Sequence, residues 1–149
     1  MEESKKSGFK MERKIKGQEG VAAIEFAIVL PLLILLVFGI IEFSVLLYDK
    51  AMITNASREG ARAGIVFNVP DRISDGEIIN VVNNYCQNYL INFDGTSAVS
   101  TNITRTGDSA GDPLIVTVSY RYDFLVLPNF ISSLTDGITL EANTVMRME

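Results

Sequence analysis

The feature that most constrains this chain is an apolar run from Val21 to Ile41, interrupted by charge only at Glu25. As an α-helix this run would be about 30 Å long, which is the thickness of the hydrocarbon core of a bilayer. Pro31 has no N–H to donate within the helix, so we expect a kink there. Gly39 lets another backbone approach closely. The run therefore predicts one helix that spans a membrane or packs among other helices.

Two carboxylates accompany the run, Glu25 near its start and Glu42 just after its end. A carboxylate inside a membrane costs about 2.5–3.5 kcal/mol, so Glu25 is a candidate functional residue. The two positions are about 100° apart around a helix, and we do not expect them to serve one shared site. We interpret Glu42 as a charge at the membrane boundary.

Charge is divided unevenly along the chain. Residues 1–20 hold six Lys/Arg and four Asp/Glu, whereas residues 21–149 hold seven and fourteen. The positive-inside rule keeps the basic end in the cytoplasm and places the acidic remainder outside. We expect a cytoplasmic leader over residues 1–20, a membrane helix over residues 21–48 and an extracytoplasmic head over residues 49–149. The leader has no apolar periodicity, so residues 1–19 are expected to lack order or form only marginal helix.

A cleaved secretory signal peptide is a competing interpretation of the N-terminus. The apolar run is longer than the apolar part of an ordinary signal peptide. The first small-x-small sequence, Ala61 to Ala63, lies far downstream behind several charged residues. Cleavage at that site is therefore not expected.

Periodicity beyond the run predicts an α+β head. The long helix should continue to about Val66, because Phe43 to Val66 contains no proline, and Asn68 to Pro70 should end it. Ser74 and Glu77 form a capping-box pattern ahead of a second, amphipathic helix from about Asp75 to Ile91.

The period then changes to two, which is typical of strands. Alternation is weak over Val99 to Ile103, clear over Leu114 to Phe124, and present again over Ile138 to Met148. Turn residues occupy Thr106 to Pro113, and Leu125 to Gly137 is expected to be a loop. We predict a three-stranded antiparallel sheet with one face packed on the helices.

Several classes of chemistry are disfavoured by composition. Histidine is absent and Cys86 is the only cysteine, so a disulfide within the chain is impossible and a structural zinc site is not expected. Asp108 and Asp112 do not follow the spacing of an EF-hand calcium loop. The main body has no basic patch for a nucleic acid. We expect no metal, no other cofactor and no enzymatic activity, and we interpret Cys86 as a core residue.

Three stretches resemble the TadE-like pseudopilins of the tight-adherence (Flp) type IVb pilus system: Gly17 to Leu33, Gly39 to Phe43, and Thr54 to Gly64. In the first, Gly20 precedes Val21, and Glu25 and Phe26 follow at the spacing of a type IVb prepilin peptidase site. The resemblance implies cleavage between Gly20 and Val21. It also implies that Glu25 neutralises the N-terminal amine of a neighbouring subunit.

The same resemblance implies location and partners. It places the chain in the inner membrane as a single-pass precursor, with prepilin peptidase, other pilin-like subunits and the pilus assembly platform as partners. Arg58, Glu59 and Arg62 belong to the resemblance, although they could form only a solvated helical face, with Glu59 and Arg62 paired at i, i+3. The alternative is a permanently anchored single-pass membrane protein whose outer domain binds a partner or ligand. A plain anchor has no reason to hold a carboxylate at position 25.

Overall fold

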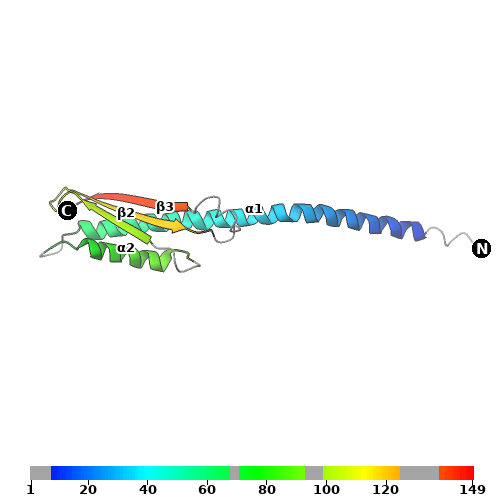
Figure 1. Cartoon of the computed structure of the whole chain (residues 1–149), viewed down its shortest axis with the longest axis horizontal. Coiled ribbons are helices and arrows are strands. Elements are labelled where there is room, and N and C mark those ends of the chain that lie inside the picture. The colour runs from blue at the N-terminus through cyan, green and yellow to red at the C-terminus, as the bar shows by residue number, and fades with distance from the viewer. Residues whose placement is uncertain (1–7, 68–70, 93–98, 125–137) are drawn as a thin grey trace, which may run out of the picture. The chain divides into compact units, whose positions relative to one another are not determined.

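The computed structural model describes residues 8–67, 71–92, 99–124 and 138–149, and it describes side chains of the first range from residue 19 onward. The elements follow the order α1-α2-β1-β2-β3 and confirm the predicted α+β class (Figure 1). The chain divides into two compact units, one ending at Ile40 and the other running from Ile41 to Glu149. We call the second unit the head. It includes residues 41–48, which the sequence assigned to the membrane helix.

Helix α1 (Gly8–Ile65) runs from the first unit into the head. It begins well before Val21, so residues 8–19 are helical, where we expected either no order or only marginal helix. Lysine, glutamate, arginine, methionine and glutamine dominate those positions, and these residues have high helix propensity. The helix also continues through Pro31 without ending.

The end of α1 at Ile65 is held by backbone and side-chain contacts. The Ile65 carbonyl accepts hydrogen bonds from the Arg72 guanidinium and from the Glu149 N–H, the latter at 3.3 Å. A cation at a helix C-terminus also favours the helix dipole. The predicted stop at residues 68–70 lies outside the described residues, as does the loop predicted over residues 125–137.

Helix α2 (Asp75–Tyr89) confirms the capping box. The Ser74 hydroxyl accepts from the Glu77 N–H at 3.3 Å, and Glu77 Oε2 accepts from the Ser74 N–H at 2.7 Å. The helix ends slightly before the predicted Ile91, because the Ile91 N–H bonds the Asp49 carboxylate at 3.0 Å and not a helical carbonyl. Its buried face consists of Ile78, Val82 and Cys86.

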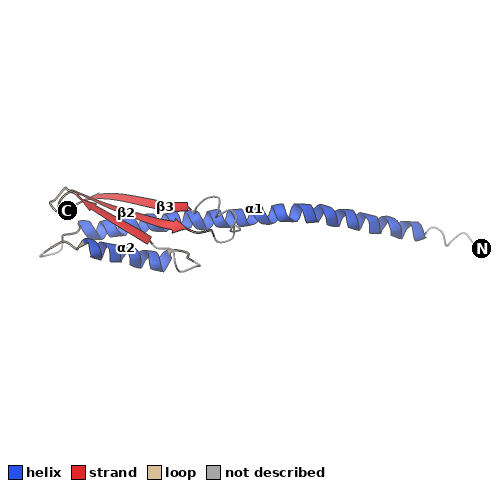
Figure 2. Ribbon diagram, viewed as in Figure 1, coloured by secondary structure: helices blue, strands red, loops and turns tan. Residues whose placement is uncertain are grey.

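The sheet confirms the predicted antiparallel arrangement, with β2 (Pro113–Tyr122) between β1 (Val99–Arg105) and β3 (Ile138–Arg147) (Figure 2). Alternate residues of β2 are buried, as the period of two predicted. Pro113 opens the central strand, a position where the missing N–H is tolerated. The buried residues of β2 are Leu114, Val116, Val118, Tyr120 and Tyr122.

Two glycines allow α1 to lie close to the rest of the head. A Cβ at Gly60 would be 2.5 Å from Val82 Cγ2 of α2, and one at Gly64 would be 2.5 Å from Leu114 Cδ2 of β2. Real Cβ atoms are not found at such distances from other carbons. The C-terminal part of α1 therefore packs so closely against α2 and the sheet that only glycine fits at positions 60 and 64 without a shift of the neighbouring side chains.

Candidate functional site

Among the described residues, one helix is long and apolar enough to cross a membrane, and its most apolar window has a mean hydropathy of 2.9. None of that window is buried within the chain. Uncovered apolar surface of this extent is not stable in water, so lipid or other protein must cover it. The feature is typical of a membrane anchor.

The predicted cleavage residues all lie on this uncovered part of α1. Val21 and Phe26 are 58% and 61% exposed, and Glu25 is also exposed. A Cβ on Gly20 would meet nothing within 4 Å. The head's fold therefore makes no use of these side chains, and they are available to another molecule.

Pro31 and Gly39 lie in the same uncovered stretch. Pro31 is exposed, and a Cβ at Gly39 would meet nothing within 4 Å. Gly39 therefore differs from Gly60 and Gly64, where close contacts inside the head leave no room for a side chain. Any close approach that Gly39 permits would be made by a different molecule.

Glu42 is buried in the head, which our interpretation of it as a charge at the membrane boundary did not anticipate. The residue is 3% exposed, and Glu42 Oε1 accepts a hydrogen bond of 2.5 Å from the hydroxyl of Tyr122. Burial first, and then this hydrogen bond, raise the pKa of the Tyr122 hydroxyl well above its ordinary range. The proton therefore stays on the tyrosine, and the carboxylate is a structural acceptor in the head.

Asp49 is a second buried carboxylate that the sequence analysis did not single out. It is fully buried, and its Oδ1 accepts the hydrogen bond from the Ile91 N–H. Its Oδ2 is buried without a hydrogen-bond partner in the described structure. Burial raises the pKa of the Asp49 carboxyl above its ordinary value, and the hydrogen bond from Ile91 offsets part of that rise. Its position seven residues after Glu42, two turns along the same helix face, was the available signal.

The Arg58-to-Arg62 motif has two faces. Gly60 and Ala61 are buried in the head, whereas Arg58, Glu59 and Arg62 are exposed. No ion pair joins Glu59 to Arg62 among the described residues, so the pairing anticipated from their spacing is not formed. The small residues thus support the fold, and the charged ones remain on the surface.

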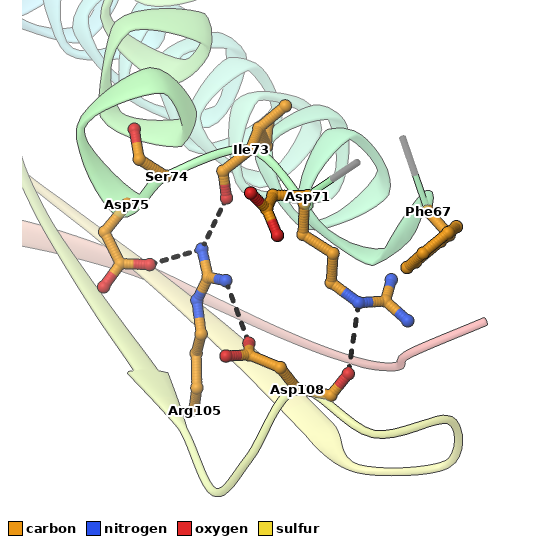
Figure 3. Close-up of a pocket in the computed structure, with 8 residues that line it drawn as sticks. Phe67, Asp71, Ile73, Ser74, Asp75, Arg105 and Asp108 are labelled. Carbon is orange, nitrogen blue, oxygen red and sulfur yellow. Dashed lines mark hydrogen bonds and ion pairs between the residues drawn. The ribbon is translucent and has the colours of Figure 1, made fainter. Parts of the chain in front are cut away.

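A pocket of about 430 Å³ lies where the chain leaves α1 and enters α2 (Figure 3). The Arg105 guanidinium lies between Asp75 and Asp108, pairing with both, and it also donates to the Ile73 carbonyl at 3.1 Å. Arg72 donates to backbone carbonyls of Ile65, Asp108 and Glu149. Both arginines therefore form hydrogen bonds or ion pairs with segments that are distant in sequence. The lining residues are Phe67, Asp71, Arg72, Ile73, Ser74, Asp75, Arg105 and Asp108.

Cys86 is a core residue, as predicted. It is 2% exposed, and burial raises the pKa of its thiol to about 11. A thiol held in this state contains little thiolate near neutral pH and is a weak nucleophile.

An exposed apolar helix followed by a compact α+β head is typical of a membrane-anchored protein, and α1 is the one such helix among the described residues. A family model described as TadE-like protein matches residues 20–62. The match confirms the resemblance to the TadE-like proteins of the Tad/Flp pilus system. It covers the anchor and the part of α1 in the head, and it ends before α2 and the sheet. No curated protein and no solved structure matches the chain.

Proposed function

We propose that this chain is a pseudopilin subunit of a tight-adherence (Flp) type IVb pilus, acting in pilus assembly, adhesion or secretion. The observation that carries the proposal is where the TadE-like match begins. It starts at Gly20, immediately before the apolar run of α1, and it includes Glu25 at the spacing of a prepilin peptidase site. The proposed role is structural and not catalytic.

In this proposal the chain is inserted in the inner membrane with its basic N-terminus in the cytoplasm. Prepilin peptidase removes residues 1–20 and leaves Val21 as the new N-terminus. The mature subunit then associates with other pilin-like subunits and the assembly platform through its anchor. The exposure of the apolar segment supports this step, because none of its most apolar window is covered by the rest of the chain.

Glu25 would pair with the amine of Val21 on a neighbouring subunit. An unpaired carboxylate in a low-dielectric helix bundle is costly, and a fixed cation close to it offsets much of that cost. Since only one stagger of two subunits brings these charges together, the pair would also fix their axial register.

The cleavage step is tested with Gly20→Leu. A Cβ at this position would have no neighbour within 4 Å, so we expect the substitution to leave the head folded and to act on recognition by the peptidase. We expect the full-length precursor to accumulate in the membrane, measured as the N-terminal mass in cells with an active prepilin peptidase. Gly39→Leu is the matched control, since it also lies in open space and should be processed normally. A parent protein that keeps residues 1–20 in such cells would contradict the proposal.

The second candidate function is that of a permanently anchored protein whose head binds a partner or ligand. The pocket between Arg72 and Arg105 favours it, because a pocket of about 430 Å³ is in the size range of small-molecule sites. The same mass measurement separates the two functions, since a permanent anchor would keep its N-terminal residues.

A further inference from the structure

The part of α1 that opens the head has two different faces. Glu42 and Asp49 lie on one face and are buried in the head. Around the rest of the helix circumference, large apolar side chains remain exposed. We call these residues the membrane-proximal patch: Ile41 (45% exposed), Phe43 (61%), Leu47 (51%) and Tyr48 (40%).

We infer that the membrane-proximal patch lies in the lipid headgroup layer. The inference rests on the proposed membrane anchoring, and it extends the lipid contact into the folded head. The occupant of the patch is the lipid of the same membrane that holds the apolar run.

Charge is the first argument for a lipid occupant. Between Phe26 and Tyr48 the only charged residue is Glu42, and its carboxylate is turned into the head and bonded by Tyr122. The next carboxylate, Asp49, is also buried. The exposed face of this helix segment therefore presents no charge that would keep it out of the headgroup layer.

Length is the second argument. The run from Val21 to Ile41 already accounts for a hydrocarbon core of about 30 Å. The seven further residues to Tyr48 extend the helix by about 10 Å, enough to pass through the headgroup layer on one side. The patch begins at Ile41, where the hydrocarbon core would end.

Residue type is the third argument. Aromatic side chains with one polar end are enriched at membrane interfaces, and Tyr48 occupies that position. Lys50 follows it directly, and its ammonium group donates to the Glu141 carbonyl at the surface of the head. A lysine at this depth keeps its charge at the polar side of the interface while its alkyl chain lies along apolar surface.

The test uses tryptophan as a depth probe, because the chain contains none. Tyr48→Trp reports on the patch, and Phe43→Trp is a second reporter in case one substitution disturbs the fold. Phe67→Trp is the matched control, since Phe67 is an exposed aromatic residue (58%) just beyond the end of α1. Each full-length variant is reconstituted in phosphatidylcholine–phosphatidylglycerol vesicles whose acyl chains are brominated close to the headgroup. Circular dichroism verifies the fold.

We expect the tryptophan at position 48 to emit at shorter wavelength and to lose most of its emission to brominated lipid. The probe at position 67 should instead be quenched by iodide in the water. The quenching of the tryptophan at position 48 by brominated lipid should be the same at low and high protein-to-lipid ratios. Quenching of position 48 by iodide and not by lipid, in protein that still floats with the vesicles, would overturn the inference and leave membrane anchoring intact.

The other possible outcomes of the quenching experiment also test the inference. If position 48 is shielded from both quenchers, or reached by lipid only on dilution, a second copy of the chain covers the patch and the inference is wrong. If positions 48 and 67 are both quenched by lipid, lipid contact is not confined to the membrane-proximal patch, and the inference is wrong. Failure of the parent chain to float with vesicles would contradict membrane anchoring itself.

Discussion

The hydroxyl of Tyr122, at the end of β2, donates a hydrogen bond of 2.5 Å to Glu42, in the first turn of α1 that belongs to the head. Both residues are buried, at 1% and 3% exposure. The bond joins positions that are 80 residues apart in sequence. It fixes the central strand to the helix at the start of the head.

Tyr122→Phe removes this hydrogen bond and keeps the ring, including its edge-on contact with Phe124 at 5.9 Å. We expect the free energy of unfolding to fall by about 1–3 kcal/mol, because a buried carboxylate loses a donor. Urea unfolding of the full chain in detergent micelles measures the change. Tyr89→Phe is the control, since Tyr89 is half exposed and its loss of a hydroxyl should have little effect. Equal stability of both variants would contradict a structural role for the bond.

Asp49 makes the stability of the head depend on pH. Its pKa in the folded chain is raised by burial, so the unfolded chain loses this proton first as the pH rises. The folded state then binds more protons than the unfolded state, and stability falls with rising pH from about pH 4 until the folded carboxyl has also ionised. Asp49→Asn should lack this fall, so its stability relative to the parent should grow over that range. Unfolding curves at several pH values test this, and parallel pH profiles would contradict it.

The glycines of α1 should respond in opposite ways to alanine. Gly64→Ala places a Cβ 2.5 Å from Leu114 and 2.6 Å from Ile78, and overpacking of this kind costs about 1–3 kcal/mol. The better helix propensity of alanine offsets up to about 1 kcal/mol of that. Gly39→Ala meets no atom of the chain and should leave the melting temperature of the head unchanged. Thermal unfolding followed by circular dichroism distinguishes them, and a Gly64→Ala head as stable as the parent would show that this contact relaxes freely.

Glu25→Gln keeps the shape of the side chain and removes its charge. If Glu25 pairs with the amine of a neighbouring subunit, cleavage should still occur but co-assembly with pilin partners should fall sharply. N-terminal mass and the amount of subunit in sheared pili measure the two effects separately. Glu141→Gln, at an exposed carboxylate of the head outside the TadE-like match, is the control. Normal assembly of the Glu25 variant would leave that residue as a recognition element for the peptidase at most.

The Cys86 thiol should be unreactive while the head is folded. Its pKa of about 11 and its burial leave almost no accessible thiolate at about pH 8. A thiol reagent should label it only after urea unfolds the head, and the labelling rate should follow the unfolding transition. Rapid labelling of the folded chain would place Cys86 at an accessible surface.

Local patterns predicted most of the fold. Ser74 and Glu77 marked the start of α2 because a capping box is complete within four residues. The alternation from Leu114 to Tyr122 marked β2 because burial on one face of a sheet repeats every two residues. These signals are carried by neighbours in sequence, and they need no knowledge of tertiary contacts.

The environment of the carboxylates could not be predicted in this way. A charged residue after an apolar run is typical of a membrane boundary. Glu42 and Asp49 are interior residues because they contact Tyr122 and Ile91, which lie far away in the sequence. Arg72 and Arg105 were missed for the same reason, since their partners are mainly backbone carbonyls and aspartates from other segments. The sequence analysis allowed at most marginal helix before Val21, because it gave more weight to the polar composition of the leader than to its helix propensity.

The burial of Glu42 and Asp49 has a consequence for biosynthesis. Helix α1 is made first, whereas Ile91 and Tyr122 follow much later in the chain. Until they arrive, the two carboxylates have no cover and remain hydrated, directly behind the apolar run. In the nascent chain they are therefore charges that resist entry into lipid. In the finished head the same residues are internal hydrogen-bond acceptors, so we expect this pair of carboxylates to limit entry into lipid before folding and to stabilise the head after it.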